Sequence, residues 1–313
     1  MKKIIRLGTR GSPLALLQAE EARRSIFQHN HGLDREVEIE IVPMRTSGDW
    51  QPQHKEQTFR DIGAGKELFT KEIDEALIEG HIDLAVHSMK DVPSVLPDQL
   101  TITATLQRAD VQDAFIGRDV KTLEELPKGA IVGTASLRRH AQLLAYRPDL
   151  KIVSIRGNVE TRLRKLSEGL ADATILAMAG LKRLGMEDRA GSVISTDVML
   201  PAAAQGAIAI ETRKDDADIV PMVANANHMA SWHAVIAERA FLRVLDGSCH
   251  TPIGALAHSV GDGGLRLRGM AARPNGSQIT RLEIVGKTDE AESLGGQLAL
   301  QMKQALPPNF FAA

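Results

Sequence analysis

The chain has 313 residues, a length that predicts two or three domains, each able to bury its own core. Apolar residues make up 43% and charged residues 25%, which excludes a disordered or fibrous protein. The formal net charge of -2 and the aromatic content of 3% argue against a nucleic-acid-binding surface or recruitment to anionic lipid, so any basic cluster must be local.

Strand-like and helix-like segments alternate through the first two thirds of the chain. Ser12 followed by Pro13 is typical of a helix start and predicts a helix to about residue 26. Apolar stripes predict further helices before Gly80, after Ser136 and after Asn158. Strands are predicted over residues 3–7, 37–41, 82–86, 130–132, 151–155 and 173–178. This alternation favours two α/β blocks, at about 1–105 and 112–200, built on parallel sheets.

The last block has a different pattern. A helix is predicted over about 231–245, followed by strands over 253–258, 265–271 and 279–285 with turn residues between them, and a final helix over about 290–305. This pattern predicts a small α+β domain with an antiparallel sheet. The predicted domains are therefore 1–105 plus about 201–225, 106–200, and 226–313.

Basic side chains follow the predicted strands of both α/β blocks. In open α/β sheets, ligands bind beyond the carboxyl ends of the strands, where helix N-termini add partial positive charge. An arginine at any one of these positions is most often a solvated surface charge. Six together predict a cleft for a small ligand with several carboxylates or phosphates, lined by Arg10, Lys90, Arg138, Arg139, Arg156 and Arg162.

Asp91 and Cys249 each allow two interpretations. Asp91 lies among basic residues and is either a salt-bridge partner or a carboxylate that stabilises a cationic intermediate. Cys249 is the sole cysteine, which excludes an intrachain disulfide. It is either a small buried apolar residue or a reactive thiol in the loop between Ser248 and His250. The histidines show no metal-binding spacing, so no metal site is predicted.

The amino terminus does not have the long apolar stretch of a secretory signal, and no apolar run reaches the length of a membrane helix. We therefore expect a cytoplasmic protein, or an organellar one if a transit peptide has been removed.

Eight segments resemble the hydroxymethylbilane synthase (porphobilinogen deaminase) family and occur in the family's order. They are GTRGSPLA at 8–15, LFTKE at 68–72, HSMKDVP at 87–93, GTASLRR at 133–139, RGNV at 156–159, AGLKRL at 179–184, QGA at 205–207 and GSCHTPIG at 247–254. Several are distinctive alone, so the set is specific. The resemblance implies two α/β domains of the type II periplasmic-binding-protein kind flanking a cleft, with the small α+β domain carrying the cysteine loop.

The resemblance also implies an activity and a cofactor. Family members condense four porphobilinogen molecules head to tail, release ammonia at each step, and make linear hydroxymethylbilane for tetrapyrrole and haem biosynthesis. The chain grows on a dipyrromethane primer held by a thioether, here to Cys249. The acetate and propionate groups of each pyrrole would account for the basic residues. Such a transferase (EC 2.5.1.61) is expected to be a monomer that takes porphobilinogen as its substrate and has no nucleic-acid or membrane partner.

Residue roles follow from the motif match. Asp91 would be the catalytic group, because a fixed carboxylate can accept pyrrole N–H bonds and stabilise the cation left when ammonia departs. The cofactor would be bound by Ser88, Lys90, Asp91, Thr134, Ser136, Arg138, Arg139, Arg162 and Arg183. The substrate would be bound by Arg10, Ser12, Arg156, Arg162, Gln205 and Lys66.

The segment 59–67 departs from the family pattern. It has one residue more than the usual Ile-Gly-Gly-Lys-Gly-like run, with Asp61 near a common lysine position and Glu67 where glycine or serine is usual. The predictions that Lys66 binds substrate and that this loop acts as a lid therefore depend on the altered segment.

Two other functional classes compete with the synthase. A solute-binding module would suit two lobes about a cleft, but it has no use for an anchored cofactor and the chain shows no export signal. A cysteine-dependent transferase or hydrolase without a tetrapyrrole role predicts a free, alkylatable Cys249, whereas the synthase predicts a blocked one.

Overall fold

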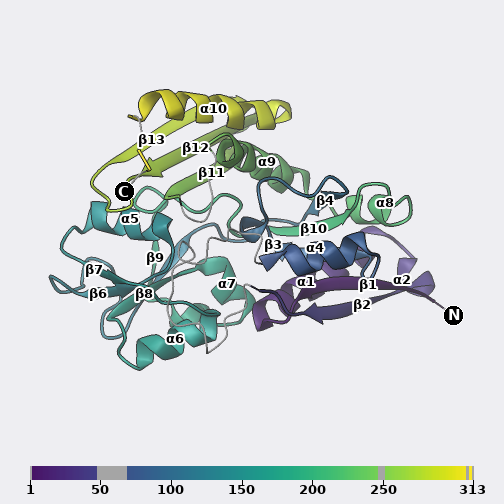
Figure 1. The fold of residues 1–313 in the computed structure, drawn as a ribbon, viewed down its shortest axis with the longest axis horizontal. Helices are drawn as coiled ribbons and strands as arrows, with labels where there is room; N and C mark the ends of the chain where they lie inside the picture. Colours follow the sequence, from purple (N-terminus) through teal and green to yellow (C-terminus); the bar gives the residue numbers. More distant parts are fainter. Residues whose placement is uncertain (1, 48–68, 246–250, 308–309, 312–313) are drawn as a thin grey trace. The chain divides into compact units, whose positions relative to one another are not determined.

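The computed structural model describes residues 2–47, 69–245, 251–307 and 310–311 (Figure 1). These residues form two compact units. The first lies within 1–49, 66–109 and 206–232, and the second within 110–205 and 233–313. The chain thus leaves the first unit after residue 109 and returns to it at residue 206. No helix among the described residues is long and apolar enough to cross a membrane.

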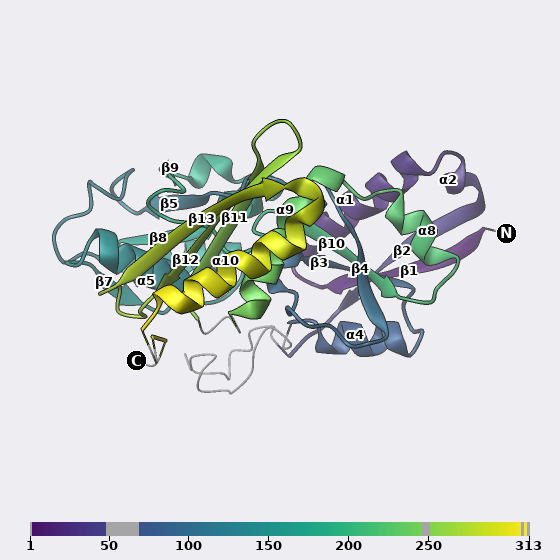
Figure 2. The same ribbon diagram turned by 90° about the horizontal axis from the view of Figure 1, so that it is seen from above.

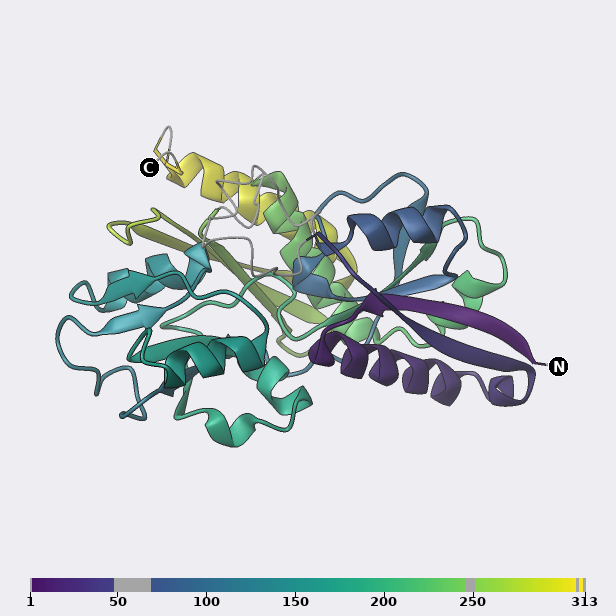
Figure 3. The same cartoon turned by 60° about the horizontal axis from the view of Figure 1, so that its bottom comes forward.

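The first unit contains a five-stranded sheet with the order β2-β1-β3-β10-β4. β1 (Lys3–Arg10) runs parallel to β2 (Val37–Met44) and β3 (Leu84–Ser88), whereas β10 (Ile208–Arg213) is antiparallel to both β3 and β4 (Leu100–Thr105). The helices are α1 (Pro13–His29), which runs alongside β1 and β2 in Figure 3, together with α2 (Leu33–Glu36), α4 (Lys71–Ile78) and α8 (Ile219–Ala224). Buried apolar residues such as Leu7, Ile26 and Ile210 fill its core.

The second unit contains a sheet of matching order, β7-β6-β8-β5-β9. β6 (Ile131–Gly133) runs parallel to β7 (Lys151–Val153) and β8 (Ala173–Ala177), and β5 (Asp113–Gly117) is antiparallel to both β8 and β9 (Ser192–Ile194). Its helices are α5 (Leu137–Tyr146), α6 (Val159–Ser167) and α7 (Met178–Arg183). β5 follows shortly after the chain enters the second unit at residue 110, and β10 follows shortly after the chain returns to the first unit at residue 206.

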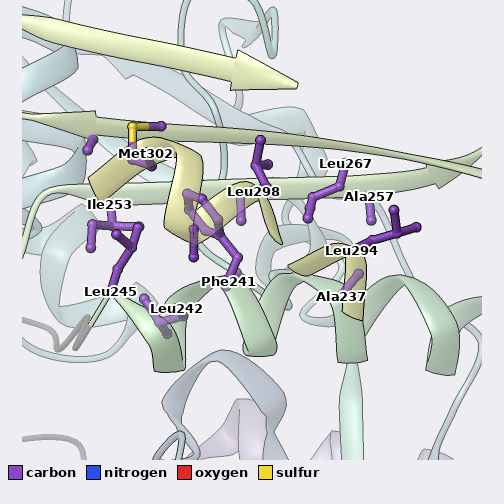
Figure 4. Packing of buried hydrophobic residues seen from close by; sticks show 14 of the residues in the cluster. Ala237, Phe241, Leu242, Leu245, Ile253, Ala257, Leu267, Leu294, Leu298 and Met302 are labelled. Atoms are coloured by element: carbon purple, nitrogen blue, oxygen red, sulfur yellow. The ribbon is translucent and has the colours of Figure 1, made fainter. Parts of the chain in front are cut away.

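The remaining part of the second unit is an antiparallel sheet packed against helices. β12 (Gly264–Ala272) pairs with β11 (Ile253–Ser259) and β13 (Ile279–Lys287). Figure 2 shows α10 (Ala291–Ala305) lying along this sheet. Residues of the sheet, of α10 and of α9 (Met229–Val244) form one apolar core around Phe241 and Leu298 (Figure 4). A Cβ atom at Gly295 would lie 2.2 Å from the Ala237 carbonyl oxygen, so this close approach of α10 to α9 requires glycine.

The predicted fold class is confirmed by these sheets, with α/β architecture followed by a small antiparallel sheet domain. The prediction of purely parallel sheets was wrong, since both larger sheets are mixed. β1 also extends three residues beyond the predicted strand end at residue 7, through Arg10. It continues that far because β2 continues beside it, and Arg10 pairs with Met44. The proposed three-domain boundaries stay a prediction.

Candidate functional site

The first unit places two of the predicted site residues at the ends of two neighbouring strands, and three more just beyond those ends. β1 and β3 are parallel neighbours, so their carboxyl ends lie at the same edge of the sheet. Arg10 ends β1, and Ser12 follows it. Ser88 ends β3, and Lys90 and Asp91 lie in the single 3-10 turn Met89–Asp91 that follows.

Arg10 and Ser12 are held by local contacts. Ser12 caps α1, where its Oγ accepts a hydrogen bond from the Ala15 backbone N–H at 3.3 Å, and Pro13 occupies the first turn. The guanidinium carbon of Arg10 lies 4.7 Å from the centre of the Phe69 ring, a cation–π contact. Arg10 and Ser12 are both half-buried, so each keeps some exposure at this sheet edge.

The turn that carries Asp91 is fixed from both sides. Ser88 Oγ and the side-chain amide of the buried Gln18 lie at hydrogen-bond distance, 2.9 and 3.0 Å from the amide nitrogen and oxygen. The Met89 backbone N–H donates to the Ala207 carbonyl oxygen at 3.0 Å. Met89 and Val92 are buried on either side of the half-buried Lys90 and Asp91. The turn therefore presents Lys90 and Asp91 together while its apolar residues anchor it.

The second unit gathers a matching set at the ends of β6, β7 and β8, which are neighbours and run parallel. Beyond β6, Ser136 caps α5 by accepting from the Arg139 backbone N–H, and the Thr134 hydroxyl accepts from the Ser136 N–H at 3.2 Å. Arg156 follows β7, and Arg183 ends α7, which follows β8.

A tight turn connects Arg156 with α6. Gly157 has a φ of +114°, a backbone conformation that residues other than glycine rarely adopt. Asn158 caps α6, where its side-chain oxygen accepts a hydrogen bond from the Thr161 backbone N–H at 2.9 Å. Arg162 donates from its Nε to the Gly157 carbonyl oxygen at 2.8 Å. The turn therefore orients Arg162 directly.

Arg138 and Arg139 are each only 5% exposed and share one carboxylate, that of Asp113 on β5. Arg138 donates to Asp113 at 2.8 Å and to the Leu200 carbonyl oxygen at 2.7 Å. Arg139 donates to Asp113 at 2.7 Å and to the Ile175 carbonyl oxygen at 2.9 Å. Gln205 adds a third hydrogen bond to Asp113 at 2.9 Å. Three of the predicted site residues are thus organised by Asp113, which sequence reasoning missed.

The electrostatics of this cluster favour a charged Asp113. Burial alone would raise the pKa of its carboxyl group, but the two guanidinium groups outweigh burial and hold the pKa below its usual range. Burial lowers the pKa of Arg138, and Asp113 opposes that change. Two guanidinium groups against one carboxylate leave one buried positive charge without a counterion among the described residues that pair with them.

Two predicted site residues lie outside the described residues. Cys249 falls in 246–250, and Lys66 falls in 48–68 together with the altered loop 59–67. The roles of Cys249 and Lys66 stay predictions from the sequence.

Comparisons with known proteins agree with the resemblance of the sequence motifs. Residues 5–221 match the family model described as "Porphobilinogen deaminase, dipyromethane cofactor binding domain", and residues 232–304 match the model of the C-terminal domain of porphobilinogen deaminase. The chain belongs to the porphobilinogen deaminase family. Members of this family are transferases, so the predicted enzyme class is confirmed.

Curated relatives match over nearly the whole chain. Porphobilinogen deaminase of Paracoccus denitrificans (strain Pd 1222) is 49% identical over 307 residues, which cover 98% of this chain and 96% of the relative. The chloroplastic porphobilinogen deaminase of Oryza sativa subsp. japonica is 48% identical over 310 residues, 98% of this chain and 86% of the relative. Among solved structures, lipoprotein Tp32 of Treponema pallidum has a TM-score of 0.46 at 12% identity, covering 72% of this chain and 91% of that one.

The dipyrromethane cofactor of this family fits the chemistry of the second unit. Each pyrrole ring carries carboxylate groups, and the Arg138–Arg139–Asp113 cluster has one positive charge in excess. The Nε atoms of Arg138 and Arg139 are buried and have no hydrogen-bond partner among the described residues. A carboxylate ligand would supply both the missing negative charge and the missing acceptors.

Proposed function

We propose that this protein is a hydroxymethylbilane synthase, which joins four porphobilinogen molecules head to tail with release of ammonia. The family match over residues 5–221 and 232–304 is the observation that carries the proposal. Basic and hydroxyl side chains at the ends of β1, β3, β6, β7 and β8 support it, because a substrate with two carboxylates per ring needs several cationic contacts.

The dipyrromethane cofactor supplies the terminal pyrrole ring onto which the first substrate is joined. We expect Cys249 to hold it through a thioether, with Ser88, Lys90 and Asp91 of the first unit as ligands. In the second unit the ligands would be Thr134, Ser136, Arg138, Arg139, Arg162 and Arg183. The excess charge beside Asp113 supports this role for Arg138 and Arg139 in particular.

Asp91 is proposed as the catalytic residue. Departure of ammonia leaves positive charge on the pyrrole, and a fixed carboxylate can stabilise that charge and accept the ring N–H. The anchoring of its turn by Met89, Val92 and the Ala207 carbonyl supports this role, since an electrostatic stabiliser is effective only when it is already in place.

Arg10, Ser12, Arg156, Arg162, Gln205 and Lys66 are proposed to bind substrate rings. Of these, Gln205 is 1% exposed and donates to Asp113 and to the Val111 carbonyl oxygen. Its contribution to substrate binding would therefore come through its hydrogen bond to Asp113. A cytoplasmic location, a monomeric state and the absence of nucleic-acid or membrane partners stay predictions.

The intact mass of the denatured protein tests the proposal. A covalent cofactor adds the mass of two porphobilinogen molecules less two ammonias to the mass calculated from the sequence. Cys249→Ser should remove this excess, and the wild-type thiol should resist alkylation. An unmodified mass that does not increase when porphobilinogen is added, together with an alkylatable Cys249, would instead favour another cysteine-dependent enzyme or a binding protein.

A further inference from the structure

The first unit contains a buried cluster of three potential metal ligands that the proposed reaction does not use. Asp74 lies on α4, His87 on β3 and Glu211 on β10. One potential ligand atom from each residue lies within 4.8 Å of those from the other two. The residues are 7%, 5% and 0% exposed, so each is more than nine-tenths buried. These three residues are called the Asp74 cluster below.

Four of the six side-chain nitrogen and oxygen atoms of the Asp74 cluster have no hydrogen-bond partner among the described residues. Within the part of the chain that the structure describes, Asp74 Oδ1, His87 Nε2 and both carboxylate oxygens of Glu211 are buried and have no hydrogen-bond partner. His87 Nε2 lies 3.0 Å from Glu211 Oε2, but this contact does not have the angle of a hydrogen bond.

The negative charge of the Asp74 cluster is not balanced by a basic residue among those that the structure describes. Two carboxylates face one imidazole, and no lysine or arginine among the described residues forms an ion pair with either carboxylate. Unpaired carboxylates are strongly disfavoured in a buried environment. Neutrality can be reached with two protons, one on Asp74 and one on His87, or with one divalent cation and a neutral imidazole.

We propose that Asp74, His87 and Glu211 form a binding site for one divalent cation of the zinc type. One imidazole nitrogen and up to three carboxylate oxygens give the mixed nitrogen and oxygen set that Zn²⁺ binds in tetrahedral geometry. Zinc ligands lie about 2.0–2.2 Å from the ion, so tetrahedral ligand atoms are roughly 3–3.5 Å apart. The 3.0 Å separation of His87 Nε2 and Glu211 Oε2 is at that spacing. Calcium and magnesium fit less well because they prefer six or more oxygen ligands.

Such an ion would join three elements beneath the turn that carries Asp91. His87 directly precedes Ser88, and the β3–β10 pairing places Ala209 opposite His87 and Ile208 opposite Ser88. An ion bound by α4, β3 and β10 would therefore fix the end of β3. Its role would be structural, and its binding would be expected to stabilise the folded protein.

Metal analysis of the cofactor-loaded protein tests this site. The protein is incubated with Zn²⁺ alone, free metal is removed, and the retained zinc is measured together with the thermal unfolding midpoint. We expect one zinc per chain and a midpoint several degrees above that of the chelator-treated protein. Asp74→Asn and Glu211→Gln should each lose the retained zinc and the shift.

His81→Gln is the matched control. His81 Nδ1 lies 3.3 Å from a Glu79 carboxylate oxygen, but this pair is exposed, so its loss should leave zinc retention unchanged. Cobalt substitution of the wild-type protein gives a second measurement that does not depend on a variant folding. A strong visible absorption band of four-coordinate Co²⁺ is expected. The proposal is overturned if the wild-type protein retains no zinc or if Asp74→Asn retains as much as His81→Gln. Shared protons would then neutralise the cluster, consistent with the burial and the Glu211 charge that raise the pKa of Asp74 to about 7.

Discussion

Asp91 ends a single 3-10 turn whose position is set by its neighbours. The side chains of Met89 and Val92 are buried, and the Met89 N–H is bonded to the Ala207 carbonyl oxygen. A substitution that keeps the shape of Asp91 and removes its charge should therefore leave the turn in place. This separates the electrostatic contribution of the carboxylate from its structural one.

Asp91→Asn should lower kcat by about 10²–10³-fold with little change in KM, as expected when a group that stabilises developing charge is lost. Steady-state rates with porphobilinogen and circular dichroism of the variant measure both effects. Asp98→Asn, an exposed carboxylate of the same segment, should behave as wild type. Near-normal turnover of Asp91→Asn would remove Asp91 from the catalytic role.

Asp113 is the residue on which the two buried arginines depend. Asp113→Asn would leave two guanidinium groups buried without a counterion, and removal of one partner from a buried ion pair typically costs about 3–5 kcal/mol. Asp119→Asn, which breaks an exposed pair with Arg118, is the matched control and should have no measurable effect. Denaturant unfolding at pH 7 measures both changes.

The pH dependence gives a second test of Asp113. Because its pKa is lowered in the folded state, the Asp113 carboxyl group takes up a proton in the unfolded chain as the pH falls through about 4, while the folded protein keeps it ionised. The stability that Asp113 contributes is therefore fully present above that pH and declines as the pH falls further. The difference between wild type and Asp113→Asn should accordingly shrink in acid. An equal difference at pH 7 and pH 3 would show that the charge is not its cause.

Residue types alone could predict most of the candidate site but not its internal pairing. Arg138 and Arg139 were predicted from their place after a strand, and the structure puts them there. Asp113 was not predicted, because it lies on β5 and meets both arginines only once β5 has paired with β8. The Asp74 cluster has the same origin, since β3 brings His87 to Glu211 only through pairing with β10.

At the scale of elements, the turn between β7 and α6 depends on one glycine. The φ of +114° at Gly157 lies well outside the small left-handed region open to other residues, and an added Cβ would lie 2.6 Å from Thr161 Cγ2. Arg162 is bonded to the carbonyl of this same residue. Strain in the turn would thus be transmitted directly to a proposed ligand of the cofactor and the substrate.

Gly157→Ala is expected to lower the unfolding free energy by about 1–3 kcal/mol and to raise KM for porphobilinogen. Gly185→Ala provides the control, since Gly185 has a φ of +64° and no atom within 4 Å of an added Cβ. It should cost less stability and leave KM unchanged. Urea unfolding and initial rates would show this, and equal effects of the two substitutions would contradict the strain argument.

Elements with their own local pattern were predicted well, and those defined by distant partners were not. Ser12, Ser136 and Asn158 each precede an apolar stripe, and each caps a helix in the structure. β4, β5, β9 and β10 were missed. β5 and β10 are short and buried throughout most of their length, so they have no alternation of apolar and polar residues to mark them. Their identity as strands comes from pairing.

For the whole molecule, the two larger sheets have the same strand order although the sequence shows no repeat of fixed short period. In both, two parallel neighbours flank a first strand, and an antiparallel strand then separates the third strand from the last. The alternation of strand-like and helix-like segments predicted two α/β domains of similar build. It did not predict the antiparallel strands at 113–117 and 208–213, which are short and mostly buried.

The position of β10 has a consequence for how the protein is made. A ribosome releases β1 to β4 first, but β4 joins their sheet only through β10, which comes after the whole of the sheet from β5 to β9. The amino-terminal half of the polypeptide would therefore be the later of the two to close, and until then β3 offers an open edge to other nascent chains. In ribosome-stalled chains whose residue 200 has just emerged, a protease should cleave residues 1–109. In stalled chains whose residue 232 has emerged, the same residues should resist cleavage. Early protection would mean that β1 to β3 resist cleavage without their last neighbour.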